Sequence, residues 1–428
     1  MAGPLAGVRV LEFSQVIAAP YAGQFLVDLG AEVLKVEPPE GESWRLQASF
    51  APQESKSFQT LNRGKRDLTL RLDREVAQDI VHALVPSMDV VLINYRPDVP
   101  PRFRIDYETL RALRPDLVYA DLTAFGRRGP WAMRPGYDGV VQAVSGLLAG
   151  EAKLRPDGSP STIATTAIAD YCTGMVMADA IVAALFHRAR TGEGQYVACS
   201  LLATALNLQG VDLMSHGLLD QARDAAAAER RRMQAQGVPY DDLVALRQGT
   251  RWPGCDLYQR CYLVRDGAIA VDACDARQRD AARQLWGVTA RVPGDVDFRQ
   301  EDDYRQDDEG AVGVATADAL RVEARLAVMA ERDALAELAA LGIPAARVVF
   351  GEEMPRDPQA IAAGLFTAIE HAGTGPQTTI SHLLRFRGMQ LDALRASPVL
   401  GSDTNAVLRS LGCSDERIGE LRKAGVIG

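Results

Sequence analysis

Short apolar segments alternate with helical patterns through the first 125 residues. Segments 8–13 (VRVLEF) and 31–37 (AEVLKVE) are rich in branched apolar residues, as buried strands are, and 21–29 between them has apolar residues at helical spacing. Two further strands are expected at 89–94 and 117–122, with helices over 74–85 and 107–113. Strands that alternate with helices predict parallel pairing through crossovers. We therefore expect an open α/β sheet of the Rossmann kind.

The later pattern predicts a long helix of small residues and a second α/β region. The helix is expected over 173–188, and 195–201 fits either a strand or a helix. Residues 218–236 are strongly charged at helical spacing, which favours a connector. The second region is expected from 257 to 348, with a hairpin over 261–272 that turns at Asp266-Gly267, helices over 316–329 and 332–341, and a helical tail at 404–411 and 414–424.

Composition narrows the possible partners. The net charge is −9, so nucleic acid is not an expected partner. Basic residues do gather in the first third of the chain, where either a solvated face or an anion site would explain them. The basic residues concerned are Arg63, Lys65, Arg66, Arg71, Arg96, Arg102 and Arg104.

The cysteines and histidines predict neither a metal site nor a permanently bound cofactor. The six cysteines form no CxxC pair and there are only five histidines. Scattered thiols of this kind, with no visible secretion signal and no apolar run long enough to span a membrane, favour a cytoplasmic protein without a membrane partner. The first strand is followed by Ser14-Gln15-Val16-Ile17, with no GxGxxG, so a nicotinamide enzyme is not expected either.

Asp170 is the most informative candidate for chemistry. It stands at the predicted start of the long small-residue helix. An N-cap role would explain it without any chemistry. The same position suits a nucleophile, because a helix N-terminus favours the ionised carboxylate, and Gly174 one turn later would leave room for a ligand. The residues alone leave both interpretations open.

Short motifs in a fixed order connect the chain to a known family. They are 5–13 (LAGVRVLEF), 30–37 (GAEVLKVE), 62–66 (NRGKR), 94–97 (NYRP), 136–138 (GYD) with Gln142 and Gly146, 191–195 (TGEGQ), 342–344 (GIP), 400–404 (LGSDT) and the tail from 407 to 427. With these motifs the chain resembles the class III coenzyme A transferase family, which includes formyl-CoA transferase and carnitine CoA-transferase.

The resemblance implies an α/β fold, a Rossmann-like large domain with a smaller α/β domain, in an interlocked-ring homodimer. It implies a large CoA-binding domain from 1–215 and 355–428, a helical connector over 216–250 and a small domain over 251–354. It also implies that acyl-CoA and small carboxylic acids are the substrates, with coenzyme A never permanently bound. In the family, the carboxylate matching Asp170 attacks the acyl-CoA thioester and passes through mixed-anhydride and aspartyl-CoA thioester intermediates.

The resemblance also assigns supporting and CoA-binding residues. Tyr137, Asp138 and Gly174 match positions that support the site. The positions matching the CoA site are Val16 at the thiol arm with Ile17 beside it, Leu70, Asn94 and Tyr95 around adenine and ribose, and Arg102 and Arg134 near the phosphates, where Lys65 and Arg66 would add positive field.

Departures from formyl-CoA transferase make formyl or oxalyl transfer doubtful. Ile17 stands where that enzyme has Gln, and Pro38 where it has Arg. The glycine-run loop of formyl-CoA transferase has no equivalent in this chain, where the nearest feature is Trp252-Pro253-Gly254.

Two other functions remain open from the sequence. An α-methylacyl-CoA racemase shares the fold, but its catalytic His falls at Tyr137, and a phenol with a pKa near about 10 is a poor proton acceptor at neutral pH. A catalytically silent acyl-CoA-binding homologue is the other alternative, against which the presence of Asp170 and Gly174 weighs.

Overall fold

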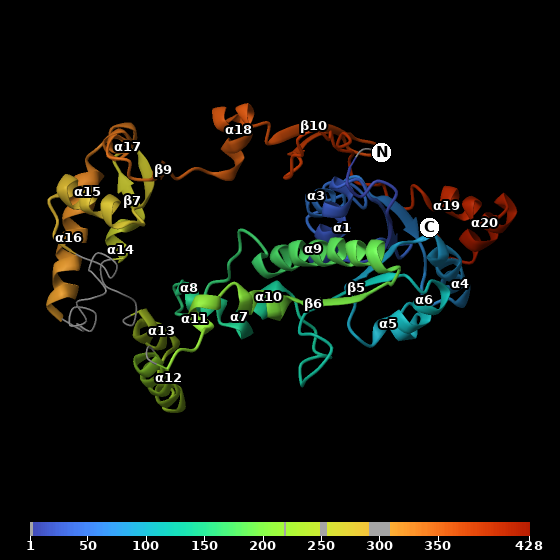
Figure 1. Cartoon of the computed structure of the whole chain (residues 1–428), viewed down its shortest axis with the longest axis horizontal. Helices are drawn as coiled ribbons and strands as arrows, with labels where there is room; N and C mark the ends of the chain where they lie inside the picture. The colour runs from blue at the N-terminus through green and yellow to red at the C-terminus, as the bar shows by residue number, and fades with distance from the viewer. Residues whose placement is uncertain (1–2, 218–219, 249–254, 291–308) are drawn as a thin grey trace. The chain divides into compact units, whose positions relative to one another are not determined.

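The computed structural model describes residues 3–217, 220–248, 255–290 and 309–428 (Figure 1). The chain divides into two compact units, which are described separately here. Unit 1 comprises Met1–Ser215 and Gln359–Gly428, and unit 2 comprises His216–Pro358.

Unit 1 is built on a six-stranded parallel sheet in the order β3-β2-β1-β4-β5-β6. The strands are β1 (Arg9–Phe13), β2 (Glu32–Glu37), β3 (Arg66–Thr69), β4 (Val90–Ile93), β5 (Val118–Thr123) and β6 (Tyr196–Ser200). This is the Rossmann order, in which the chain reverses direction between β1 and β4. Ligands of such sheets bind at that switch point, outside the carboxyl ends of the strands.

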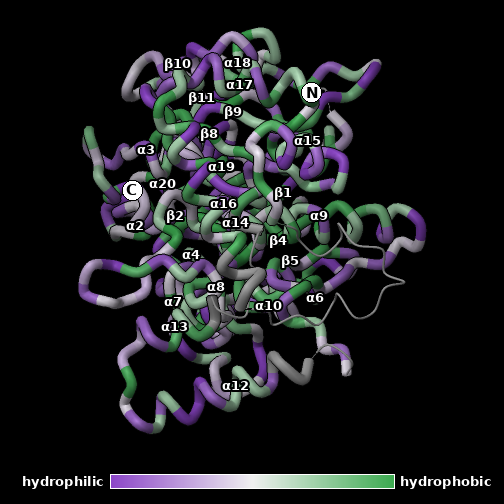
Figure 2. Tube along the Cα trace, turned by 90° about the vertical axis from the view of Figure 1, so that its left-hand side faces the viewer, coloured by the Kyte–Doolittle hydropathy of each residue, from purple (hydrophilic) through white to green (hydrophobic). Residues whose placement is uncertain are grey.

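Helices cover both faces of the sheet, which explains why β1 to β5 are buried almost throughout, including charged residues such as Lys35 and Asp67. In β1, Leu11 and Phe13 belong to one core cluster and Val10 to the other, as the alternation of side chains along a strand requires. Figure 2 shows hydrophobic colour concentrated along β1, β4 and β5 and long hydrophilic runs on α12. The sheet is thus the centre of a two-sided core.

The helices of unit 1 follow the predicted alternation. They are α1 (Ala18–Asp28), α2 (Ser43–Leu46), α3 (Lys56–Asn62), α4 (Glu75–Leu84), the 3-10 turn η1 (Val85–Ser87), α5 (Val99–Arg102), α6 (Tyr107–Leu113), α7 (Asp138–Ser145), α8 (Leu147–Glu151), α9 (Ile168–Thr191), α10 (Leu201–Asn207), α11 (Gly210–Leu213), α19 (Thr404–Ser410) and α20 (Asp415–Lys423). The returning C-terminal segment also holds α18 (Pro358–Ala362) and an antiparallel hairpin of β10 (Phe366–His371) and β11 (Gly375–Ile380), which the sequence pattern did not predict.

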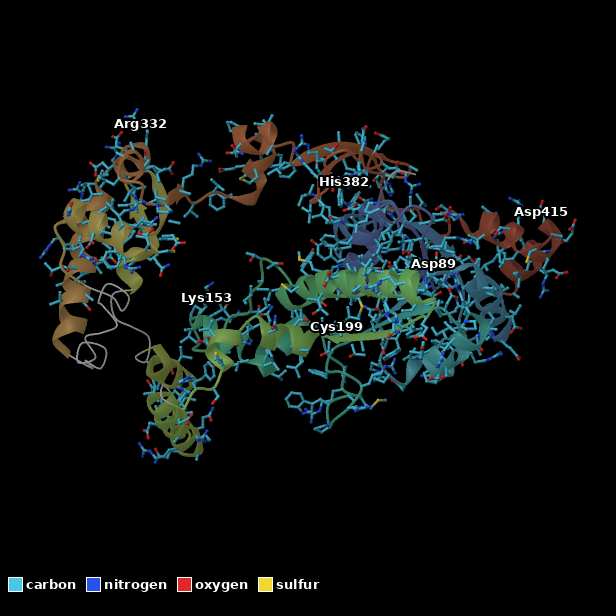
Figure 3. All side chains as sticks on the ribbon, in the orientation of Figure 1. Asp89, Lys153, Cys199, Arg332, His382 and Asp415 are labelled. Carbon is cyan, nitrogen blue, oxygen red and sulfur yellow. The ribbon has the colours of Figure 1, made fainter. Side chains whose placement is uncertain are left out.

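Helix α9 runs beside α1 and antiparallel to the strands (Figure 1). Its C-terminal Arg188 is ion-paired at 2.9 Å with Asp89, which directly precedes β4 and also pairs with Arg114 (Figure 3). Because this end of α9 is fixed at the amino end of β4, the first turn of α9 is directed toward the carboxyl ends of the strands. By length and composition α9 would also suit a membrane span, which the sequence pattern did not predict, and half of its most apolar stretch is buried inside the protein.

Unit 2 contains the second α/β region. Its elements are α12 (Asp220–Ala235), α13 (Tyr240–Gln248), α14 (Cys255–Tyr258), β7 (Gln259–Val264), β8 (Gly267–Asp272), α15 (Ala276–Trp286), α16 (Glu309–Ala327), α17 (Glu331–Ala340), β9 (Ala345–Arg347) and the 3-10 turn η3 (Gly351–Arg356). The hairpin expected over 261–272 is confirmed as β7 and β8, and β9 completes a three-stranded antiparallel sheet. The ends of the expected connector at 218–219 and 249–250, and Trp252-Pro253-Gly254, lie outside the described residues.

Candidate active site

Asp170 is the third residue of α9, so the helix begins five residues earlier than predicted and Asp170 is not its N-cap. The N-cap is Ala167, whose side chain cannot cap a helix. Asp170 is 6% exposed. No side-chain hydrogen bond or ion pair of its carboxylate is found within the described part of the chain. The N-cap interpretation of this residue is therefore wrong.

Asp138 takes over the capping of α9. It is the first residue of α7, and its Oδ1 accepts hydrogen bonds from the backbone N–H groups of Ala169, at 2.8 Å, and of Asp170, at 3.3 Å. These two N–H groups have no partner within the helix, so a carboxylate from another helix satisfies them. The contact fixes the first turn of α9, and with it the backbone of Asp170, relative to α7.

Gln142 holds Asp138 in turn. One turn along α7, its side-chain Nε2 donates to Oδ2 of Asp138 and to the carbonyl of Ile163 at 3.3 Å, while its Oε1 accepts the N–H of Ile163 at 3.0 Å. The amide thereby ties the segment before α9 to the same carboxylate. Gln142 is 1% exposed, so water competes little with these bonds.

Burial and a neighbouring acid shift the ionisation of Asp170. Burial in a region of low dielectric constant and, to a smaller extent, the negative charge of Asp138 together raise the pKa of Asp170 to about 7. The sequence predicted that the helix N-terminus would favour the ionised carboxylate of Asp170. In the structure, burial opposes this effect, and Asp138 already accepts the first N–H groups of the helix.

Gly174 serves the packing of two helices and does not border open space. A Cβ at this position would lie 2.6 Å from the carbonyl oxygen of Ala18 and 3.1 Å from the ring of Tyr21. The glycine therefore allows α9 to approach α1 closely. Its expected role of leaving room for a ligand is corrected to this one, and the first turns of the two helices consequently lie side by side.

A cleft of about 550 Å³ opens next to Asp138 and the start of α9. Its apolar wall comes from Ile17, Trp44, Leu61 and Tyr171. Neutral hydroxyl groups from Ser57, Thr60 and the segment 162–166 line much of the rest, and Lys56 is the one cationic residue among the described lining residues. The cleft can take an apolar chain that carries a polar or anionic end.

The switch point of the sheet borders this site. Val16 and Ile17, which follow β1, pack in one cluster with Leu61, Ala167 and Tyr171. Asn94, which follows β4, donates to the carbonyl of Gln15 at 2.8 Å and accepts its N–H at 3.0 Å. The structure thus brings Val16, Ile17 and Asn94 together at the expected edge of the sheet.

The other predicted CoA-site residues are more scattered. The side chain of Leu70 is 1% exposed within the core of the sheet, so any contact of this residue with a ligand would come from its backbone, and its assignment stays a prediction. Tyr95 is partly buried against the same core, and burial raises its pKa to about 12. Arg102 and Arg134 are exposed over the rings of Phe103 and Trp131, and Tyr137 is 61% exposed. These last three residues do not line the cleft.

Part of the early basic cluster is structural. Lys65 is buried and paired with Glu12 at 2.9 Å, and burial lowers its pKa to about 8. Arg66 pairs with Glu32 and Asp403. Neither side chain is free to add field at a CoA phosphate, and that expectation is corrected.

Comparison with known proteins connects this geometry to a family. The family model described as CoA-transferase family III matches residues 5–404. This chain belongs to CoA-transferase family III. It is 32% identical over 424 residues to a succinate–glutarate CoA-transferase of Agrobacterium fabrum, covering 95% of this chain and 96% of the relative. It is 36% identical over 303 residues to a probable fatty acyl-CoA transferase of Mycobacterium tuberculosis, covering 68% of this chain and 76% of the relative.

Solved structures agree with this membership of CoA-transferase family III. A CaiB/BaiF family protein from Brucella suis superposes with a TM-score of 0.70 at 29% identity, covering 96% of this chain and 100% of that one. The protein is accordingly an enzyme of the CoA-transferase class, and the resemblance in its motifs is confirmed.

Two residues near the site were not expected from the sequence: Glu42, whose Oε2 accepts the backbone N–H of Val16 at 2.8 Å, and Lys56 of the cleft. The amide contacts of Gln142 were not expected either. Glu42 and Lys56 lie in no recognised motif, and their importance arises from where the segment between β2 and β3 folds back. Gln142 was visible as part of a family motif, but no helix was predicted over 138–142, so the spacing of four that brings Gln142 next to Asp138 on α7 could not be used.

Proposed function

We propose that this CoA-transferase moves coenzyme A from an acyl-CoA donor to a carboxylic acid acceptor and that Asp170 is its covalent nucleophile. The observation that carries the proposal is a buried carboxylate without a side-chain partner in the described structure. Its backbone is held by Asp138, and Ala167 and Tyr171 on either side of it line the cleft, although Asp170 itself is not among the lining residues. A pKa of about 7 makes this group more basic, and so more nucleophilic once ionised, than an ordinary aspartate.

The proposed cycle balances without a nucleotide or an added cofactor. An Asp170 oxygen attacks the thioester carbonyl, the C–S bond breaks, and CoA leaves as a thiolate. The thiolate attacks the aspartyl carbonyl of the mixed anhydride, which releases the donor acid and leaves an aspartyl-CoA thioester. The acceptor carboxylate attacks that thioester, which frees the CoA thiolate and forms a second mixed anhydride. The thiolate then attacks the acceptor's acyl carbonyl in this anhydride, which gives the new acyl-CoA and regenerates the carboxylate of Asp170. The energy of the thioester is retained in the enzyme-bound acyl intermediates.

The first turn of α1 is a suitable source of hydrogen bonds for the oxyanions that develop in these steps. No acceptor for the backbone N–H of Ile17 or Ala18 is found among the described residues, and the first turn of α9 packs beside this turn through Gly174. Preorganised backbone donors of this kind commonly stabilise tetrahedral intermediates.

The cleft supports a substrate acid that has an apolar chain and a second anionic end. Ile17, Trp44 and Tyr171 supply apolar surface, and Lys56, which has no ion pair in the described structure, supplies a positive charge. A dicarboxylic acid would place one carboxylate at Asp170 and the other near Lys56. Substrates of the relatives are named as succinate and glutarate, which fit this description.

The racemase alternative has less support. Racemases shuttle a proton between a His and an Asp. Tyr137 occupies the position of that His and is largely exposed, and no histidine is among the described residues that line the cleft. A silent binding protein would have no use for a buried acid with a raised pKa, because an unused charge in such a place only destabilises the fold.

We also propose that the enzyme functions as an interlocked homodimer. Unit 1 exposes apolar side chains that a second copy would cover. They are Met175, Val176 and Phe186 on α9, and Val211, Leu213 and Met214 on and after α11. Elution of active enzyme at the mass of a monomer would contradict this assembly.

Chemical capture tests the nucleophile. The enzyme would be incubated with acyl-CoA donors, treated with borohydride or hydroxylamine, digested and analysed by mass spectrometry. The modification is expected on the peptide that contains Asp170 and is expected to be absent from Asp170→Asn. Asp179→Asn, an exposed acid on the same helix, is the matched control and should be modified like the wild type. Full turnover with an unmodified Asp170 would contradict the proposal.

A further inference from the structure

Val16 adopts a backbone conformation that its side chain disfavours. Its φ is +71°, in the left-handed region, although it is a β-branched residue. Such a conformation is a genuine outlier for valine and persists only where the surroundings enforce it. Val16 follows β1 at the switch point of the sheet, so the strain lies at the edge of the candidate active site.

The surroundings of this loop do enforce its conformation. The N–H of Val16 donates to Oε2 of Glu42 at 2.8 Å. Nζ of Lys35 donates to the carbonyl of Ser14 at 2.8 Å, and Asn94 holds both the N–H and the carbonyl of Gln15. Three successive residues of the loop are therefore held by side chains from outside it.

Glu42 and Lys35 act as one buried pair. Glu42 is 4% exposed and Lys35 is fully buried, and Nζ of Lys35 lies 3.1 Å from Oε1 of Glu42. Lys35 also lies 3.5 Å from Glu12, which keeps it near a counter-charge if Glu42 is replaced. Two buried charges thus hold a carbonyl and an N–H only two residues apart in the same loop.

The loop in turn positions the wall of the active site. Val16 and Ile17 pack against Leu61, Ala167 and Tyr171, and the last two flank the first turn of α9. A change in the φ of Val16 would rotate this wall away from the start of α9. Burial of the Glu42–Lys35 pair costs desolvation free energy. Through the loop, this buried pair influences the geometry around Asp170.

We infer that Glu42, supported by Lys35, is a positioning residue that locks Val16 in its left-handed conformation and so sets the position of the acyl-CoA thioester against Asp170. The inference rests on the proposed function. Glu42 touches no reacting atom in this account and acts only through the backbone of Val16.

A double-mutant cycle tests the inference. Glu42→Leu removes the acceptor at similar volume, and kcat is expected to fall at least about 10-fold with a smaller change in KM, since the thioester would still bind but in a poorer position. Glu42→Gln keeps an acceptor oxygen for the N–H of Val16 and should retain most of the activity. Glu40→Leu, an exposed acid two residues away, is the matched control.

The decisive variant is Val16→Gly. Glycine adopts a positive φ without strain, so the hydrogen bond from residue 16 to Glu42 is less important for keeping this conformation. The loss caused by Glu42→Leu should therefore be several-fold smaller in the Val16→Gly background than in the wild type. An equal fractional loss in both backgrounds, or a kcat of Glu42→Leu within 2-fold of the wild type, would overturn the inference.

Hydrogen exchange gives a readout that does not depend on turnover and can be taken on the wild-type enzyme as well as on a variant. In the wild-type enzyme the amide of Val16 should be protected from exchange, and in Glu42→Gln it should stay protected. Free exchange at the rate of an exposed loop would overturn the inference. If Asp170→Asn transfers CoA normally, the proposed function is wrong. The exchange result for Val16 still tests whether Glu42 holds Val16 in its left-handed conformation.

Discussion

Oδ1 of Asp138 accepts the backbone N–H of Asp170 at 3.3 Å, so the two acids are linked through the main chain. Asp138 is occupied by Ala169, Asp170 and Gln142, which leaves the carboxylate of Asp170 available for chemistry. Two acids in one buried site repel one another when both are ionised. The arrangement therefore makes the carboxylate of Asp170, the proposed nucleophile, more basic and also positions its backbone.

The activity should depend on the ionisation of Asp170. Since only the carboxylate is nucleophilic and its pKa is raised to about 7, kcat/KM should rise with pH below 7 and level off above it. Initial rates across a pH series with a fixed donor and acceptor would measure this. A flat profile from pH 5 to 8 would mean that ionisation of Asp170 does not limit the reaction.

Asp138→Asn should move that pH profile to lower pH. The substitution removes the charge that raises the pKa of Asp170, yet an amide oxygen can still accept the N–H of Ala169. Burial remains the larger cause, so the midpoint should stay above that of an ordinary aspartate. The same pH series on the variant measures the shift, and an unchanged midpoint would show that the two acids are not coupled.

Replacement of Asp170 should stabilise the fold at alkaline pH. Because its pKa is higher in the folded than in the unfolded state, the folded protein binds more protons between pH 4 and 7, and stability declines as pH rises through that interval. Asp170→Asn should therefore raise the free energy of unfolding at pH 8 by on the order of 4 kcal/mol, with little effect near pH 4. Denaturant melts at both pH values measure this, with Asp179→Asn as the control; an equal effect at both would refute the linkage.

Lys56 should affect the choice of substrate acid. Lys56→Met is expected to lower kcat/KM for a dicarboxylic acceptor by about 5-fold relative to a monocarboxylic acid of the same length, as loss of an exposed ion pair of about 1 kcal/mol implies. Lys153→Met, at a well-exposed lysine outside the cleft, is the control. Equal decreases in kcat/KM for both acids would show that Lys56 does not take part in substrate recognition.

Much of the fold could be predicted because parallel strands and their helices leave strong local patterns. β1, β2, β4 and β5 lie within about one residue of the expected segments, and α6 has the expected bounds. The start of α9 was misplaced because its cap comes from Asp138, a residue 32 positions before Asp170, and local sequence cannot reveal such a contact. The hairpin of β10 and β11 was missed because its exposed strands carry little apolar alternation.

The candidate site was predictable only where motifs marked it. Asp170, Asp138 and Asn94 lie near the switch-point edge or the cleft, but the side chains of Leu70 and Lys65 are buried inside unit 1. A basic residue that pairs with a buried acid looks the same in sequence as one that faces a phosphate. Glu42 gave no signal, because its contact with Val16 spans 26 residues and depends on the path of an irregular segment.

The rate of CoA transfer by Asp170→Asn tests the central claim most directly. The variant should bind CoA with near wild-type affinity, since Asn keeps the shape of the side chain, and should transfer CoA at least about 10³-fold more slowly, because an amide cannot form the anhydride. Asp179→Asn should transfer at the wild-type rate. Transfer by Asp170→Asn within 10-fold of the wild type, in enzyme shown by mass spectrometry to be free of deamidation, would contradict the account.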